Sequence, residues 1–175
     1  MNVKDTDIYW IGTLGGPLIL MEREALMHWK GDVAVGKESD RFEQSDYERA
    51  CEVSDWLGSI EVGDRMALVL AMPNETAIFK IDSKSALIVR WIWGESDEQV
   101  QGILRDFDFN QSWIDAEANI QCESGELILF DSVIDGRAIS DFLIIDVEPG
   151  LYTATTLSYQ HNKETNLFLI KLDGR

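Results

Sequence analysis

Carboxylates are the most abundant side chains in this sequence that could do chemistry. The 175 residues include 32 Asp and Glu against 15 Lys and Arg. Closely spaced acids, such as Asp106 with Asp108 or Asp115 with Glu117, could serve a glycoside hydrolase, which needs two carboxylates roughly 5–10 Å apart. Because a chain with this many acids always contains some pair at that spacing, the pairs do not favour hydrolysis. We expect most of these carboxylates to lie on the solvated surface.

Other residue types and motifs do not indicate catalysis or a bound cofactor. His28 and His161 lie outside any HExxH-type spacing, and two separated cysteines cannot form a zinc site alone. No GxSxG or Walker sequence occurs. The glycine-rich segment 12–17 leads into an apolar strand, so we interpret it as a tight turn with positive φ at Gly15 or Gly16. The sequence predicts a protein that is not an enzyme and that holds neither metal nor cofactor.

Tryptophan is the other residue type with binding potential. Trp91 and Trp93 share one face of an expected strand and could stack on a sugar or a base, although their apolar neighbours favour packing in the core. An alternative function is therefore a small-ligand or carbohydrate-binding module with a tryptophan-lined cleft, with or without hydrolytic activity.

The net charge of −17 is a stronger indication of function. So many like charges cost stability, and they attract cationic partners while repelling polyanions. Nucleic acid and anionic membrane are therefore poor candidates, and a basic protein is the favoured partner. An antirestriction-type DNA mimic shares the same charge argument and stays open.

The charge is concentrated in the second half of the chain. Residues 1–94 have a net charge of −6 and residues 95–175 have −11. The densest stretch is 95–131, with ten acids and Arg105 as its one base. This stretch either forms one negative face or belongs to an evenly solvated surface. Aromatic anchors next to acids are typical of protein interfaces, and the partner-binding residues that we predict combine both types: Asp106, Asp108, Phe109, Trp113, Asp115 and Glu117.

The sequence also predicts the cellular location of the protein and the state of its two cysteines. The start of the chain lacks the apolar region of a signal peptide, and no stretch approaches 18 apolar residues, so we expect a cytoplasmic protein. Cys51 and Cys122 are expected to be buried free thiols and not a disulfide.

The candidate residues named above lie mostly on or next to expected β-strands. Alternation of apolar and polar residues and turn signals predict an α+β fold, mainly an antiparallel β sheet or meander with two or three short helices, in a single domain over 1–175. The expected strands are 8–12, 17–21, 66–71, 76–81, 86–93, 114–122, 126–131, 141–147, 151–160 and 166–172.

Capping signals place the helices. A short helical turn at 22–30 is expected to end at Gly31. Ser45 with Glu48 forms a capping-box sequence, and that helix is expected to continue to Gly58. Ser96 with Gln99 begins another, whose buried stripe is Val100, Ile103, Leu104 and Phe107.

Parts of the sequence also resemble the immunity protein 21 family of bacterial polymorphic toxin systems. The resemblance covers nearly the whole chain and includes a GDRMALVL run at 63–70, LFDS at 129–132 and PGLY at 149–152. A departure is the charged MERE at 21–24, where a proline-led turn is expected. The single residues that carry the resemblance are Trp10, Gly15, Gly16, Pro17, Leu18, Leu20, Trp29, Gly31, Asp46, Tyr47, Ala50, Cys51 and Gly58.

This resemblance implies a cytoplasmic antitoxin that binds the C-terminal toxin domain of a delivered effector. Many such toxins are nucleases, and a nuclease cleft is basic because it binds phosphates, so an acidic inhibitor would fit it. The residues that carry the resemblance are mostly apolar, glycine or aromatic. They are typical of fold determinants and do not identify a binding site.

Overall fold

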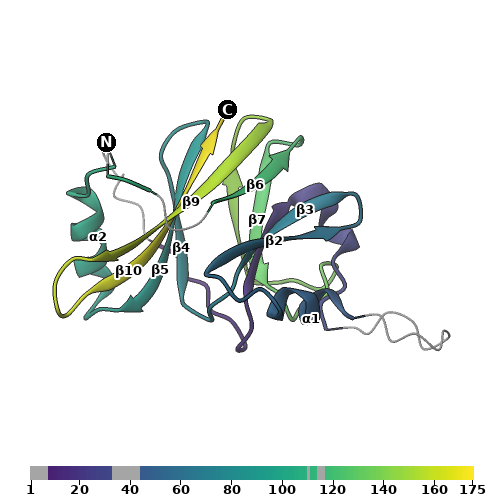
Figure 1. Ribbon diagram of the computed structural model, residues 1–175, viewed down its shortest axis with the longest axis horizontal. Coiled ribbons are helices and arrows are strands. Elements are labelled where there is room, and N and C mark those ends of the chain that lie inside the picture. The colour runs from purple at the N-terminus through teal and green to yellow at the C-terminus, as the bar shows by residue number, and fades with distance from the viewer. Residues whose placement is uncertain (1–7, 33–43, 110, 114–116) are drawn as a thin grey trace.

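Two five-stranded antiparallel sheets form the body of the protein (Figure 1). The computed structural model describes residues 8–32, 44–109, 111–113 and 117–175. Sheet A has the strand order β4-β5-β10-β9-β6, and sheet B has the order β2-β3-β1-β7-β8. The strands are β1 Leu18–Glu22, β2 Leu57–Val62, β3 Arg65–Leu70, β4 Thr76–Lys80, β5 Ser85–Trp93, β6 Glu117–Cys122, β7 Glu126–Asp131, β8 Phe142–Asp146, β9 Gly150–Gln160 and β10 Asn166–Gly174.

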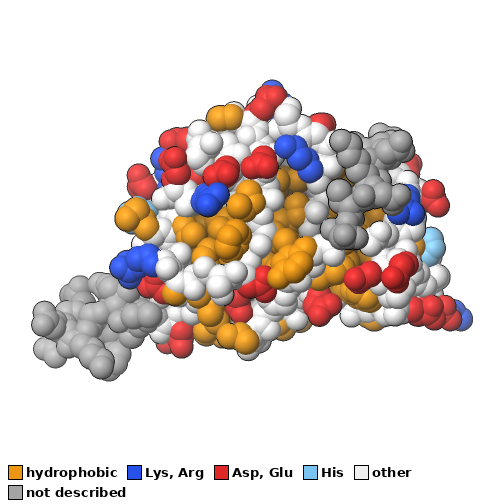
Figure 2. Space-filling view, turned by 180° about the vertical axis from the view of Figure 1, so that it is seen from behind, with side chains coloured by type: hydrophobic (Ala, Val, Ile, Leu, Met, Phe, Trp, Pro, Cys, Tyr) orange, Lys and Arg blue, Asp and Glu red, His pale blue; other side chains and the backbone are white. Residues whose placement is uncertain are grey.

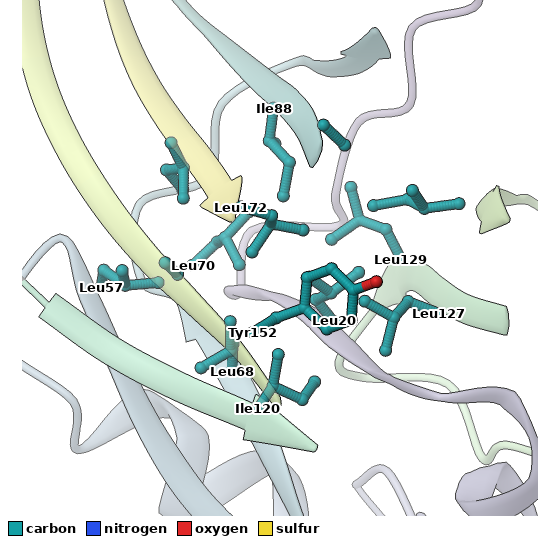
Figure 3. Packing of buried hydrophobic residues seen from close by; sticks show 14 of the residues in the cluster. Leu20, Leu57, Leu68, Leu70, Ile88, Ile120, Leu127, Leu129, Tyr152 and Leu172 are labelled. Carbon is teal, nitrogen blue, oxygen red and sulfur yellow. The ribbon is translucent and has the colours of Figure 1, made fainter. Parts of the chain in front are cut away.

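The inner faces of the two sheets pack on each other and form the main hydrophobic core. Side chains alternate along each strand, so one residue in two points into this core. Figure 3 shows this packing at the side of Tyr152, whose hydroxyl donates to the carbonyl oxygen of Glu148 at 2.5 Å. The residues labelled there come from both sheets: Leu20, Leu57, Leu68, Leu70, Ile88, Ile120, Leu127, Leu129, Tyr152 and Leu172.

Short helices cover the outer faces of both sheets. The 3₁₀ helix η1 (Arg23–His28) and helix α1 (Asp46–Cys51) pack on sheet B, where Trp29 is fully buried. Helix α2 (Asp97–Arg105) packs on the outer face of sheet A (Figure 1). Each sheet is therefore apolar on both faces, which is why several strands read as continuous apolar runs.

The predicted fold class is confirmed, and most strands lie within a residue or two of the predicted bounds. The predicted strand at 8–12 is wrong: this segment makes only an isolated bridge between Ile11 and Thr76. The turn that follows has φ +117° at Gly15, as expected.

Helix α1 begins as predicted but ends early. The Ser45 hydroxyl accepts from the Glu48 N–H, and the Glu48 carboxylate accepts from the Ser45 N–H. The helix stops at Cys51, and Gly58 lies in β2, a strand that the sequence did not predict. Gly58 is needed there because a Cβ would lie 2.6 Å from a methyl group of Val53.

Helix α2 has the predicted start and buried stripe. The Ser96 hydroxyl accepts from the Gln99 N–H, whereas the Gln99 side chain accepts from the Glu95 N–H, so the reciprocal half of the capping box is shifted by one residue. Val100, Ile103, Leu104 and Phe107 are all buried.

The cysteine prediction is half correct. Both thiols are free, and Cys122 is buried, where desolvation raises its pKa. Cys51 is exposed, because α1 ends at this residue and presents it to solvent.

Candidate functional site

The first two predicted partner-binding acids lie where α2 ends. Asp106 caps the helix, since its backbone N–H donates to the Leu104 carbonyl oxygen, and its side chain is exposed. Asp108 is also exposed. The chain turns here because Phe107 enters the aromatic layer on sheet A while its acidic neighbours stay in solvent.

The predicted aromatic anchors are half-buried in that same layer. The rings of Phe109 and Trp113 both meet the edge or face of Phe107, at centroid distances of 5.0 and 5.9 Å. The Trp113 indole N–H donates to the Phe109 carbonyl oxygen at 3.2 Å. Phe107 in turn packs on Tyr159 of β9 at 5.0 Å. These contacts fix the segment after α2 onto sheet A and leave part of each ring accessible.

The other two predicted acids, Asp115 and Glu117, lie close to the start of β6 in the sequence. Asp115 lies outside the described residues. Glu117 is the first residue of β6, at the edge of sheet A, and its carboxylate is exposed. It meets the Arg175 guanidinium at 3.9 Å, with both side chains more than half exposed. A contact of this kind contributes little free energy and leaves the carboxylate available.

Other acids of the 95–131 stretch have structural partners. Glu123 binds Arg65 at 2.6 Å, and this ion pair holds the pKa of Glu123 below its usual range. Glu126 pairs with Arg23 at 3.3 Å. Asp131 accepts from the Leu14 N–H at 2.7 Å. The acidity of the C-terminal part of this stretch therefore serves the fold, and sequence reasoning missed it because each partner is distant along the chain.

An open pocket of about 500 Å³ lies where the two sheets meet at one end. The chain before β2 forms one wall, and sheet A forms the other. The Trp56 ring is 41% exposed and stacks on Phe168 at a centroid distance of 4.6 Å. The lining residues are Asp55, Trp56, Leu57, Glu117, Thr156, Ser158 and Phe168.

Two buried polar side chains in this region have no hydrogen-bond partner among the described residues. Thr156 lines the pocket, and its Oγ1 is buried and unpaired. Arg90 on β5 is fully buried, and none of its three guanidinium nitrogens is paired. Desolvation lowers the pKa of Arg90 to about 9. Arg90 is the cross-strand neighbour of Phe168 but does not line the pocket.

Trp91 and Trp93 do not line this pocket. Trp91 packs on Trp10 at 5.3 Å in the layer beneath α2, as core packing predicts. Trp93 is 47% exposed, so the expectation of core packing fails for this residue. The tryptophan that borders the pocket is Trp56, which the sequence analysis did not single out. A signal was available, because Asp55-Trp56 is also an aromatic residue beside an acid.

Acidic and hydrophobic side chains occupy different parts of one face of the protein. On the face shown in Figure 2, hydrophobic side chains gather near the middle and acidic ones surround them. Within the described part of the chain, no three His, Cys, Asp or Glu side chains form a group that could hold a metal ion. No described helix is long and apolar enough to cross a membrane.

Comparison with known families places the chain. The model of the family described as immunity protein 21 matches residues 9–165. Comparisons with curated proteins and with solved structures found no significant match. The matched segment contains both sheets up to the turn before β10, together with the residues whose pattern resembles this family. The chain therefore belongs to the immunity protein 21 family.

Proposed function

We propose that this protein is a cytoplasmic immunity protein that binds a cognate toxin domain of a polymorphic toxin system and neutralises it. The observation that carries the proposal is the family match over residues 9–165. Members of an immunity family act on a toxin partner, and inhibition requires only stoichiometric binding, so we propose no catalytic activity.

The charge supports a basic toxin, and a nuclease is the class that fits best. A net charge of −17 favours fast association with a cationic cleft and disfavours direct binding to nucleic acid. Carboxylates on the inhibitor would occupy the toxin groups that otherwise bind phosphates.

For the interface, we propose the acidic surface around the end of α2 and the start of β6. Asp106, Asp108 and Glu117 are exposed there, and Asp115 precedes Glu117 in the sequence. Phe109 and Trp113 keep part of their rings accessible and are held rigid by Phe107, which reduces the entropy lost on binding. These six residues would combine electrostatic steering with apolar contact.

Coexpression with a candidate toxin domain from a neighbouring gene tests the proposal. Cells that produce the toxin alone should stop growing, and cells that also produce this protein should grow. Purified toxin and protein should form a stoichiometric complex. Continued growth arrest, together with no complex in a pull-down, would refute the function.

A further inference from the structure

We propose that the pocket lined by the stacked rings of Trp56 and Phe168 binds one basic side chain, an arginine or lysine, of the toxin. This inference rests on the proposed function and adds the chemistry of one anchor point. Its occupant is a protein side chain, with the charged group near the carboxylates of Asp55 and Glu117 and the aliphatic stem on the aromatic wall.

The lining charge of the pocket favours a cation. Asp55 and Glu117 both line it, and none of the described lysines, arginines or histidines does. Both carboxylates are exposed. Asp55 has no ion pair among the described residues, and Glu117 has only the 3.9 Å contact with Arg175.

The aromatic wall suits the stem and the charge of such a side chain. Trp56 stacks on Phe168 with an interplanar angle of 23°, so the two rings form a rigid stack at the pocket. Tryptophan binds cations on its ring face more strongly than other aromatic residues do, and the methylene groups of arginine or lysine pack on the same surface. Leu57 adds an apolar contact.

Thr156 provides an observation that is independent of the acids. Its side chain is fully buried, lines the pocket and has an unpaired Oγ1. Buried polar groups normally have a partner, because an unpaired one costs about 1–3 kcal/mol. A hydroxyl oxygen can accept from an ammonium or a guanidinium group, which is the chemistry of the proposed occupant.

Among the described residues, the arginines that oppose a cation here are Arg175, which meets Glu117 at 3.9 Å, and Arg90. Arg90 lies on β5, next to Phe168 and on the side away from β9. Phe168 therefore lies between Arg90 and the pocket-lining strand β9. If Arg90 instead made this an anion site, removing the acids would strengthen binding and removing Arg90 would abolish it.

Small probes test the pocket on the protein alone. We expect N-acetyl-arginine methylamide to shift the NMR signal of the Trp56 indole N–H, assigned with Trp56→Phe, and to saturate on the order of 1 mM, the affinity typical of so small a ligand. The citrulline analogue has nearly the same shape without the charge and should not bind. Equal shifts with both probes, or no saturable shift with arginine, would overturn the proposal.

Variants locate the binding. Asp55→Asn with Glu117→Gln should weaken binding of the arginine probe about tenfold or more, as expected for losing charge-assisted contacts. Glu24→Gln with Asp146→Asn removes the same charge from exposed sites outside the pocket and should leave binding unchanged. Binding of N-acetyl-aspartate methylamide that is lost in Arg90→Met would show an anion site and refute the proposal. Thermal unfolding checks that each variant is folded.

The toxin separates this inference from the proposed function. If the pocket variant binds toxin as tightly as wild type does, the anchor is wrong and the immunity function stands. If the arginine probe binds but the protein neither binds nor neutralises the toxin, the function is wrong and the pocket remains a site for a basic side chain.

Discussion

At the scale of single residues, the unpaired arginine in the core is the most unusual feature. Arg90 occupies an inward-facing position on β5, two residues after Ile88, and lies opposite Thr76 and Phe168. Burial of a charge without a partner costs several kcal/mol in most proteins. This expected cost makes Arg90 a useful site for substitution.

Replacing this charge should stabilise the protein. We expect Arg90→Met to raise the free energy of unfolding by about 1–4 kcal/mol, because a buried charge is exchanged for an apolar chain of similar length. Urea denaturation at neutral pH measures it. Arg90→Lys keeps the charge and is the matched control, which should gain nothing. A destabilised Arg90→Met would mean that the guanidinium has a stabilising partner.

At the scale of elements, a buried glutamate joins β1 to the turn between β6 and β7. Glu22, at the end of β1, is 1% exposed. One of its carboxylate oxygens accepts from the backbone N–H groups of Glu123 and Ser124, both at 2.5 Å. Arg65 of β3 lies 3.8 Å from the other oxygen. This contact links sheet B to the end of β6 and so helps to position the strand that begins with Glu117.

Removing the carboxylate tests this link. Glu22→Ala should lower the free energy of unfolding by about 1–3 kcal/mol, since two backbone donors lose their acceptor. Glu24→Ala, two residues away and exposed, should change it by less than about 0.5 kcal/mol. Chemical denaturation of both variants gives the comparison, and similar losses in the two would contradict the structural role of Glu22. Glu22→Gln keeps an acceptor and should recover part of the loss.

At the scale of the whole molecule, we expect the excess negative charge to act on association with the proposed basic partner. The field of many acids steers a cationic partner and can raise association rates from about 10⁵–10⁶ to 10⁸–10⁹ M⁻¹s⁻¹ at low salt. The position of each acid matters, because salt screens the interaction between exposed charges that are more than about 10 Å apart. The acids nearest the interface should therefore contribute most to the rate.

Charge reversal compares two sets of equal size. Reversing Asp106, Asp108, Asp115 and Glu117 to lysine should slow association with the toxin about tenfold at low salt. Reversing the exposed acids Glu24, Asp32, Glu61 and Glu75 should slow it less. Stopped-flow association rates at several salt concentrations measure both. Equal effects would mean that the charge acts as general background and that the proposed surface is not the interface.

Local signals made much of the fold predictable. The Ser45–Glu48 capping box, the α2 stripe and the alternation in β6 depend on residues within a few positions of one another, and each is confirmed. The prediction of where α1 ends was wrong because the end of this helix depends on contacts with distant residues. By its spacing in the sequence, Leu57 fits the apolar face of the predicted helix. In the structure it belongs to β2, pairs with Leu70 of β3 and packs in the core between the sheets, and no local pattern reveals this pairing.

The sequence by itself determined the negative charge, the antiparallel β character and the family. Only the tertiary structure decided where the acids lie and what they contact: Glu123 and Glu126 pair with arginines 58 and 103 positions away, whereas Asp55 and Glu117 line one pocket. It also brought Trp56 onto Phe168 and left Arg90 and Thr156 without partners. The physical reason is that charge and periodicity are properties of neighbours along the chain, whereas burial and pairing depend on which distant strands meet.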